Sequence, residues 1–320
     1  MISLGILGCS EIAFRRFMPA VKDVEGICVK AVAEEYDPKK LEAFSDTYGL
    51  ETLNSFTELI DREDIDAVYV PQPPALHFKW AKYALEKGKH VLIEKPSTTE
   101  FKTSEELVNL AESKGLALHE NYMFQYHSQI NEIQDLIATD RIGDVRLIRA
   151  DFGFPMRAQN DFRYNAALGG GALLDAGGYT TKLATILLGS SIKVDSASVN
   201  MMDGFEVDMY GSASFSNDKG TVCQIAFGMD CSYRCSLEVW GSKAKLYTNR
   251  VFTAPPDFRP VVQIESNAGI EEIVLNEDRH FEHSIEMFVK AVSDDSLRKR
   301  LYGEILLQSR LIDEIRSVGK

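Results

Sequence analysis

Short apolar runs alternate with helix-like segments over the first 121 residues, and this alternation restricts the possible folds more than any other feature of the sequence. The apolar runs occur at residues 2–8, 27–33, 66–70, 91–93 and 117–121. The segments between them carry apolar residues at helical spacing. Strands that alternate with helices form a parallel sheet with right-handed crossovers. We therefore predict a doubly wound α/β domain over residues 1–121.

The rest of the chain, residues 122–320, follows a different pattern. Strand-like runs separated by short turns fill residues 192–275, after a further strand near residues 145–154. Helices are expected near residues 129–139, 279–293 and 303–317. Runs of strands joined by short turns predict a mainly antiparallel open sheet, so this half is expected to be a second domain of the α+β class.

Composition excludes several classes of function. The chain has 320 residues, 45% of them hydrophobic and 26% charged, as in an ordinary globular protein. Its formal net charge of -13 argues against binding to nucleic acid or to an anionic membrane surface. The N-terminus enters a strand without the features of a signal peptide, and no apolar run reaches membrane-spanning length, so a cytoplasmic location is expected.

Cysteine and histidine usage indicates neither disulfides nor a metal site. None of the five cysteines forms a Cys-x-x-Cys pair, and buried free thiols are therefore expected. His280 and His283 lie three residues apart, but no further ligand is suggested near them. We predict no bound metal.

The run Val91–Pro96 carries the first candidate catalytic residue. It reads as a buried parallel strand that ends in Glu94, Lys95 and Pro96. Pro96 stops the strand, and ligands of open α/β sheets bind just beyond the carboxyl ends of strands. Lys95 is therefore placed for chemistry, although a solvated Lys-Pro turn is the simpler interpretation of these residues alone.

The first strand and the helix after it are typical of a dinucleotide-binding unit. Gly5 and Gly8 keep two small positions of the glycine fingerprint, at wide spacing, and Ala13 could serve as the third. The backbone N–H groups at the helix start would then hold a pyrophosphate. The residues expected to line this turn are Cys9, Ser10, Glu11 and Ile12. An ordinary strand–helix turn is the alternative.

Acidic residues at the end of the second strand predict which cofactor binds. Glu34 and Glu35 would accept hydrogen bonds from the adenosine ribose and repel a 2′-phosphate, so NAD is expected rather than NADP. Lys39 and Lys40 could reach a phosphate, but they also fit a solvated helix start. Residues expected near the nicotinamide follow the strand at 66–70 or close the strand at 91–93: Pro71, Gln72, His77, Glu94 and Lys95. For His77 a surface role is the alternative.

A second stretch with candidate catalytic residues begins at Gly169-Gly170-Gly171. Glycines allow close approach of the backbone to a ligand, and Asp175 and Tyr179 are four residues apart in the helix that follows. A carboxylate and a phenol on one helix face indicate a pair that handles protons. The alternative is a flexible loop followed by a core helix that Asp175 caps.

Together these motifs resemble the Gfo/Idh/MocA oxidoreductase family. The resemblance rests on Gly5–Gly8, Glu94-Lys95-Pro96, and the glycine run with Asp175 and Tyr179, in this order. It implies a Rossmann domain for a nicotinamide cofactor and a C-terminal domain whose sheet often forms the dimer contact. The family's lysine and aspartate fall on Lys95 and Asp175. Its usual acid/base histidine is here Tyr179, as in the dihydrodiol dehydrogenase and sugar ketoreductase branches.

Further motifs resemble the nucleotide-diphosphosugar 3-ketoreductases of this family. They are the segments 121–127, 152–155 and 161–164, and they imply substrate contacts at Asn121, Phe124, Arg163 and Tyr164. That branch usually has an arginine-serine pair after the second strand, which implies NADP. This chain has Glu34-Glu35 there instead, so the NAD prediction is kept.

The predicted function is hydride transfer between a nicotinamide cofactor and a carbonyl or hydroxyl carbon of a sugar or sugar derivative. Lys95 would stabilise the alkoxide and lower the pKa of Tyr179, which exchanges the proton. Asp175 would hold a substrate hydroxyl or the Lys95 ammonium. Alternatives are a trans-dihydrodiol or pentose dehydrogenase and, from another class, a non-catalytic NAD-binding regulatory protein. A homodimer or homotetramer is expected through the C-terminal sheet.

Overall fold

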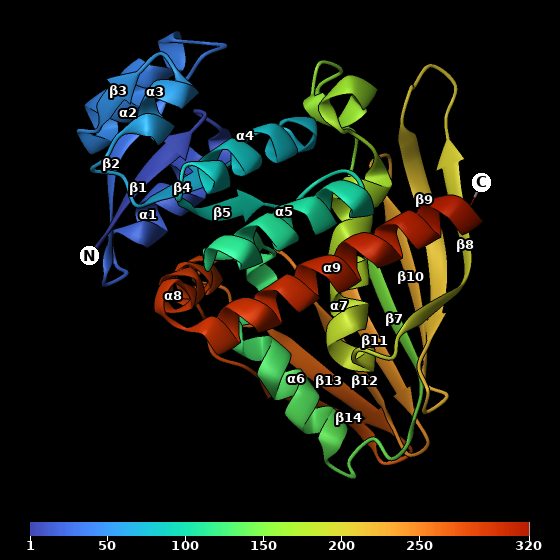
Figure 1. Ribbon diagram of the computed structural model, residues 1–320. Helices are drawn as coiled ribbons and strands as arrows, with labels where there is room; N and C mark the ends of the chain where they lie inside the picture. Colours follow the sequence, from blue (N-terminus) through green and yellow to red (C-terminus); the bar gives the residue numbers. More distant parts are fainter. Residues whose placement is uncertain (320) are drawn as a thin grey trace. The chain divides into compact units, whose positions relative to one another are not determined.

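The computed structural model describes residues 1–319, and these form two compact units (Figure 1). The first unit consists of Met1–Tyr122 and Phe281–Ser309. The second consists of Met123–His280 and the end of the chain from Arg310. Each unit contains one sheet, and each is described by itself below.

The first unit is built on a parallel sheet of six strands in the order β3-β2-β1-β4-β5-β6. This order confirms the predicted doubly wound fold of the Rossmann type, in which the strand order reverses between β1 and β4. The strands are β1 Ile2–Leu7, β2 Ile27–Ala33, β3 Glu51–Leu53, β4 Ala67–Val70, β5 His90–Glu94 and β6 Leu118–Asn121.

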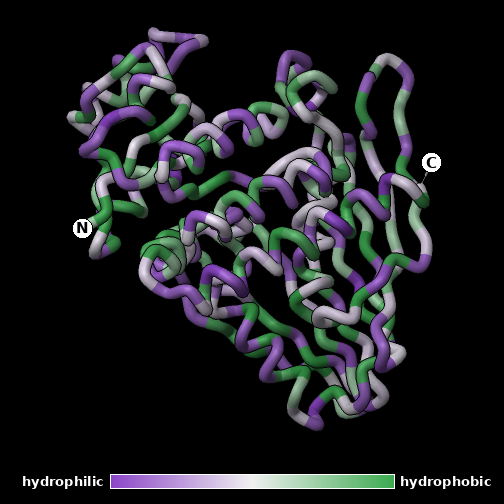
Figure 2. Tube along the Cα trace, viewed as in Figure 1, coloured by the Kyte–Doolittle hydropathy of each residue, from purple (hydrophilic) through white to green (hydrophobic). Residues whose placement is uncertain are grey.

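Both faces of this sheet are covered, which explains why its central strands β4 and β5 are almost entirely buried. Val68 and Val70 of β4 face a core formed with α3, α4 and α5, whereas Tyr69 faces a core formed with α1 and α2. Figure 2 shows hydrophobic positions recurring along these strands. The helices are α1 Met18–Val21 with the preceding π-helical turn η1 Ala13–Phe17, α2 Lys39–Tyr48, α3 Phe56–Asp61, α4 Pro74–Glu86 and α5 Phe101–Lys114.

A late segment of the chain completes the core of the first unit. Helix α8, His280–Ser293, contributes Ile285 and Phe288 to the face that also buries Leu92 of β5. The proposed division is into residues 1–121 and 122–320, whereas the first compact unit also includes residues 281–309. These later residues bury apolar side chains of β5. Helix α9, Asp295–Val318, begins in the first unit and ends in the second.

The second unit contains a sheet of eight strands in the order β14-β13-β12-β11-β7-β10-β9-β8. Strands β7 and β10 pair in parallel, and the other pairs are antiparallel, so the predicted mainly antiparallel sheet is confirmed. The strands are β7 Val145–Gly153, β8 Lys193–Met201, β9 Asp208–Ser216, β10 Val222–Gly228, β11 Arg234–Gly241, β12 Lys245–Asn249, β13 Val261–Ser266 and β14 Gly269–Val274.

One face of this sheet carries the helix on which the second candidate stretch lies. The π-helical turn η5, Leu173–Gly177, and helix α7, Gly178–Leu188, pack on β7 and β10 (Figure 1). Tyr210 and Trp240 point to the opposite face and are 46% and 55% exposed. The remaining helical elements of the unit are η2 Met123–Tyr126, α6 Ser128–Ala138, η3 Phe162–Tyr164 and η4 Ala166–Leu168.

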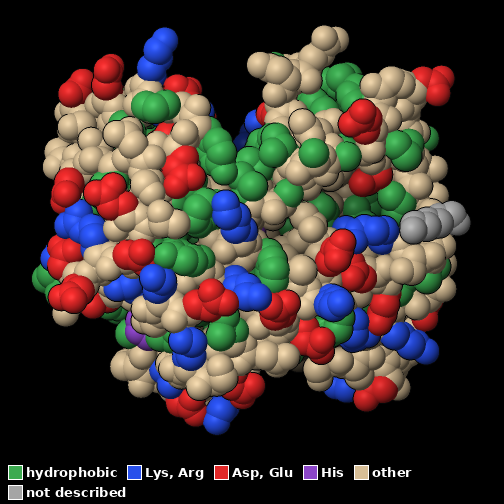
Figure 3. Space-filling view, turned by 45° about the horizontal axis from the view of Figure 1, so that its top comes forward, with side chains coloured by type: hydrophobic (Ala, Val, Ile, Leu, Met, Phe, Trp, Pro, Cys, Tyr) green, Lys and Arg blue, Asp and Glu red, His purple; other side chains and the backbone are tan. Residues whose placement is uncertain are grey.

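Charged side chains of both signs are interspersed over the surface in Figure 3. The cysteines among residues 1–319 are free thiols. Within the same residues, no helix combines the length and the apolar character that a membrane span requires.

Candidate functional site

The turn after β1 has a tight backbone built from small residues. Gly8 adopts a φ of 115°, which side chains other than glycine rarely allow. The Ser10 hydroxyl then accepts a hydrogen bond from the N–H of Ala13 at 3.2 Å, where the helix begins. Ala13 is fully buried against the sheet. The small residues at the turn are thus Gly8, Ser10 and Ala13, at the spacing of the glycine fingerprint.

Glu34 ties this turn to the end of β2. Its carboxylate is buried and accepts hydrogen bonds from the N–H groups of Cys9 at 2.8 Å and Tyr36 at 2.9 Å. Burial and the Glu34 charge raise the pKa of the Cys9 thiol to about 12, so this thiol stays protonated at neutral pH. Glu35 is exposed and accepts from the N–H of Phe56 at 2.7 Å.

Gln72, which follows β4, borders the same turn. A Cβ added to Gly8 would come within 3.3 Å of the Gln72 side chain. Gln72 is 9% exposed, and neither polar atom of its amide has a hydrogen-bond partner among the described residues. A buried amide without partners costs about 1–3 kcal/mol. The Gln72 amide lies beside Gly8, where a bound dinucleotide would supply its hydrogen-bond partners.

Lys95 follows β5, and its side chain is half-buried. Residues close to it on both sides along the chain form hydrogen bonds within the protein. Glu94 accepts hydrogen bonds from the Tyr69 hydroxyl at 2.7 Å and from the Asn121 amide at 2.6 Å. Burial raises the pKa of Glu94, and these two donors oppose that shift. On the other side of Lys95, the N–H of Ser97 donates to Glu120 at 2.7 Å. The backbone that carries Lys95 is thus anchored before and after the lysine.

Asp175 lies in η5 and forms an ion pair with Arg163. The Arg163 Nε donates to Asp175 Oδ2 at 2.7 Å, and its Nη1 lies 3.1 Å from Asp161. Both side chains are largely buried, with exposures of 20% for Arg163 and 14% for Asp175. In a partly buried site such a pair is more strongly coupled than a surface pair. The structure therefore brings together two of the predicted site residues, Arg163 and Asp175.

Tyr179 lies in the first turn of α7 and is 7% exposed. Its ring packs against Phe152 and Phe124, with centroids 5.2 and 5.8 Å away. Its hydroxyl lies 3.9 Å from the sulfur of Met123, at the distance of a weak hydrogen bond. The ring is thus fixed by apolar packing. Tyr179 belongs to the second unit, whereas Lys95 belongs to the first.

The glycine run makes room for the protein's own groups. A Cβ on Gly170 would lie 2.3 Å from the Arg163 carbonyl oxygen, and one on Gly171 would lie 2.3 Å from the Asp208 carboxylate. Asp208 also accepts a hydrogen bond from the N–H of Leu173 at 2.6 Å, at the start of η5. The close approach predicted for these glycines therefore occurs with Asp208 and Arg163, which fix the start of the helix that carries Asp175.

Comparisons with known proteins cover both units. Residues 2–122 match the GFO/IDH/MocA family described as "Oxidoreductase family, NAD-binding Rossmann fold", and residues 130–247 match the GFO/IDH/MocA C-terminal domain. The chain belongs to the Gfo/Idh/MocA oxidoreductase family. The prediction of a nicotinamide-dependent oxidoreductase is thereby confirmed.

Curated Gfo/Idh/MocA relatives match along nearly the whole chain. The dTDP-3,4-didehydro-2,6-dideoxy-alpha-D-glucose 3-reductase of Actinomadura kijaniata is 37% identical over 99% of this chain and 95% of its own. The enzyme of the same name from Saccharopolyspora spinosa is 36% identical over 98% of this chain and 96% of its own. Among solved structures, KijD10, a 3-ketoreductase from Actinomadura kijaniata in complex with NADP and TDP-benzene, superposes with a TM-score of 0.96 at 36% identity, covering 99% and 97% of the two chains.

Several residues expected at ligands of this Gfo/Idh/MocA protein have protein partners instead. Gly5 lies inside β1, where a Cβ would meet the Leu59 side chain at 2.2 Å, so it makes room for α3. Asn121 is 2% exposed and uses its amide on Glu94 and Ser284. Phe124 is fully buried against Tyr179. In each case spacing along the sequence could not show that a neighbouring element fills the space.

The other predicted site residues have varied surroundings. Glu11 is exposed and pairs with Arg15 at 2.6 Å, whereas Ile12 is half-buried at the helix start and Pro71 is buried after β4. The Tyr164 hydroxyl accepts from the N–H of Arg157 at 2.8 Å. His77 is buried rather than at the surface.

Asp208 is the positioning residue that sequence reasoning missed. It opens β9, far along the chain from the glycine run, and nothing in its local sequence marks it. Burial raises the pKa of its carboxyl group, and the hydrogen bond from Leu173 opposes that shift. The signal that points to it is the glycine run itself, since consecutive glycines allow another group to approach the backbone closely.

Proposed function

We propose that the chain reduces a keto group in the sugar of a nucleotide-activated deoxysugar, with a reduced nicotinamide dinucleotide as hydride donor. The observation that carries this proposal is the match to dTDP-sugar 3-reductases at 36–37% identity over 98–99% of the chain. KijD10 has also been solved with one lysine replaced by alanine or glutamate and one tyrosine replaced by phenylalanine, the residue types predicted here to be catalytic.

The residues around the first turn fit a dinucleotide. Gly8 has the required positive φ, and the buried amide of Gln72 stands beside it without a protein partner among the described residues. The N–H groups from Cys9 to Ile12 would hold the pyrophosphate, and Gln72 would meet the cofactor. When bound, the reduced nicotinamide supplies the hydride.

Lys95 and Tyr179 would handle the charge and the proton of the reaction. The carbonyl carbon gains a hydride, and its oxygen takes one proton, which the Tyr179 hydroxyl donates. The ammonium of Lys95 would stabilise the negative charge on that oxygen. Asp175, oriented by Arg163, would hold a substrate hydroxyl. Solvent then returns the proton to Tyr179.

The carboxylates after β2 favour NADH over NADPH. Glu34 is held beside Cys9, within the dinucleotide turn, where a 2′-phosphate would be repelled. The KijD10 complexes contain NADP, so NADP is a stronger candidate than these carboxylates alone suggest. Dissociation constants for NADH and NADPH decide between them, and equal or tighter binding of NADPH would overturn the preference for NADH.

The comparisons do not favour the alternative functions. The trans-1,2-dihydrobenzene-1,2-diol dehydrogenase of Xenopus laevis is 33% identical over only 50% of this chain, and a D-xylose 1-dehydrogenase (NADP(+)) of Haloferax volcanii is 26% identical. A non-catalytic NAD-binding protein would have no need of Lys95, Asp175 and Tyr179 together.

The exposed face of the eight-stranded sheet supports the proposal of a homodimer or homotetramer. Tyr210 and Trp240 are large apolar side chains on that face. A sheet face with such residues is a frequent interaction surface. Light scattering that gives a monomer mass at micromolar concentration would contradict this proposal.

The function is tested by following oxidation of NADH and of NADPH in the presence of a dTDP-linked 3-keto deoxysugar. Rapid oxidation is expected with the dTDP-sugar and slow oxidation with the same sugar lacking the nucleotide. Turnover of free pentoses or of dihydrodiols with the oxidised cofactor, in the absence of any reaction with dTDP-sugars, would overturn the proposal.

A further inference from the structure

His77 connects two loops at the carboxyl edge of the first sheet. It lies in the first turns of α4 and is fully buried. Its Nδ1 is 2.7 Å from the carbonyl oxygen of Pro96, and its Nε2 is 2.7 Å from the carbonyl oxygen of Gln72. Gln72 follows β4 and Pro96 follows β5, two neighbouring parallel strands. A single imidazole ring thus spans both strand ends.

The two loops carry different parts of the proposed chemistry. Gln72 borders Gly8 of the dinucleotide turn, and Pro96 comes directly after Lys95. The backbone around Lys95 is anchored at Glu94 and at Ser97 by buried carboxylate contacts. The ring of His77 adds the contact that joins this anchored segment to the cofactor side of the site.

The surroundings of the ring keep it neutral. Burial lowers the pKa of His77 to about 4, the nearby charge of Lys95 acts in the same direction, and the two carbonyl groups oppose the shift. At neutral pH the imidazole therefore carries one N–H, which donates to one of the two carbonyls, while the other ring nitrogen packs against the second carbonyl without donating to it. A neutral, fully enclosed ring without access to solvent has no means of exchanging a proton with a substrate. Its contribution has to come through the groups it holds.

We propose that His77 is a positioning residue, whose ring lies between the two carbonyls and sets the place of Lys95 relative to the Gln72 loop, by a hydrogen bond to one carbonyl and by close packing against the other. The proposal rests on the proposed catalytic role of Lys95. Misplacement of a reacting group by about 1 Å can cost a hundredfold in rate, so loss of the Pro96 contact is expected to lower kcat. Loss of the Gln72 contact is expected to weaken cofactor binding instead.

Two conservative substitutions separate the contacts. An asparagine amide nitrogen lies close to the position of a histidine Nδ1, and a glutamine amide nitrogen lies close to that of Nε2. His77→Asn can therefore keep a donor for Pro96, and His77→Gln can keep one for Gln72. His90→Asn is a matched control, because His90 opens the same strand β5 at its other end and accepts from the backbone N–H of Ala117 at 2.9 Å.

The experiment measures kcat, the cofactor dissociation constant and thermal unfolding for these variants with a dTDP-linked keto sugar. His77→Gln should lower kcat by about tenfold or more with cofactor binding within about twofold of the wild type. His77→Asn should keep kcat within about threefold and weaken cofactor binding by about tenfold. His90→Asn should lower only the unfolding temperature.

Wild-type kcat in His77→Gln, or an equal loss of kcat in His90→Asn, would overturn the proposal. If His77→Gln does not fold, His77→Asn decides, because wild-type cofactor binding in that variant contradicts the proposed link to Gln72. A Lys95→Ala variant, measured in parallel, separates the proposed role of the lysine from the positioning role of His77. Full turnover in Lys95→Ala refutes the proposed role of the lysine, whereas slow turnover in Lys95→Ala with unaltered His77 variants refutes the positioning role alone.

Discussion

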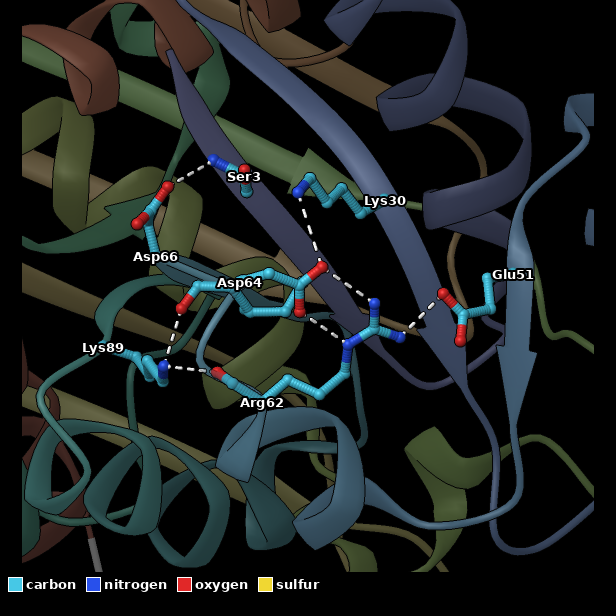
Figure 4. A network of polar contacts seen from close by, with 8 residues as sticks. Ser3, Lys30, Glu51, Arg62, Asp64, Asp66 and Lys89 are labelled. Carbon is cyan, nitrogen blue, oxygen red and sulfur yellow. Dashed lines mark hydrogen bonds and ion pairs between the residues drawn. The ribbon is translucent and has the colours of Figure 1, made fainter.

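The two ends of the first sheet differ in whether every polar side chain finds a partner within the protein. At the amino end, Arg62 pairs with Asp64 at 2.8 Å and with Glu51 at 2.7 Å, and Lys30 and Lys89 add further contacts (Figure 4). At the carboxyl end, Gln72 is buried without a hydrogen-bond partner among the described residues. Polar groups that satisfy one another stabilise a fold, and a polar group left to a ligand indicates function. This difference agrees with the proposal that the ligand binds at the carboxyl end of the sheet.

The largest effect is expected from Lys95→Ala at that end. Loss of the ammonium removes stabilisation of the developing alkoxide, so kcat should fall by about a hundredfold or more. Binding of the reduced cofactor should change little, since the turn at Gly8 is intact. Steady-state kinetics and a cofactor titration on the same preparation check both statements, and a variant that turns over like the wild type would remove Lys95 from the mechanism.

Tyr179→Phe extends the comparison to the second unit. The substitution keeps the ring that packs on Phe124 and Phe152 but removes the proton, so kcat should fall by roughly a hundredfold. The effect shrinks if water or Lys95 delivers the proton. Tyr302→Phe is the control, because the buried Tyr302 hydroxyl donates to the Leu116 carbonyl in the first unit and should affect stability alone. Equal losses of kcat in both variants would contradict the assignment.

Acidic pH should lower the free energy of unfolding, because the unfolded chain takes up a proton at His77 more readily than the folded protein does. Its pKa is about 4 in the folded protein and about 6.5 in an unfolded chain, so the unfolded chain binds more protons between these values. The contribution of neutral His77 to stability is complete above pH 6.5 and is lost as the pH falls toward 4. Between pH 7 and pH 5 the loss is about 2 kcal/mol. Urea unfolding at both pH values should show a smaller loss in His77→Gln, and an identical loss would contradict this origin.

The smallest effect is expected at the amino end. Arg62→Ala removes ion pairs to exposed carboxylates, which contribute little to stability and are screened by salt. The hydrogen bonds from Arg62 lower the pKa of Asp64, so this contribution also fades in acid. Turnover should stay at the wild-type value. A loss of activity comparable with that of Lys95→Ala would break the distinction between the two ends of the sheet.

The residues at the carboxyl end of the first sheet could be predicted from sequence because they directly follow their strands along the chain. Apolar strands alternate with helices, parallel strands end at one edge, and Gly8 and Lys95 each follow their strand within a residue. The parallel, doubly wound sheet follows from the same pattern.

The contacts that complete the site could not be predicted, because their partners come from distant parts of the chain. Asn121 looked like a substrate contact, but its amide is taken by Glu94 and by Ser284 of α8. The glycine run looked like a ligand cradle, but Asp208 of β9 occupies the space beside it. The sequence shows which residue types are present. Only the packing of distant elements shows which side chains already contact other parts of the protein.

The most direct test of the account is the fate of the hydride. The protein is given a reduced cofactor that carries deuterium at both C4 positions of the nicotinamide, together with a dTDP-linked 3-keto deoxysugar, and the sugar product is examined by mass spectrometry and NMR. The account predicts one deuterium on the carbon that bore the keto oxygen, and loss of this product in Lys95→Ala. An unlabelled sugar, or labelled product formed as fast by Lys95→Ala as by the wild type, would contradict it.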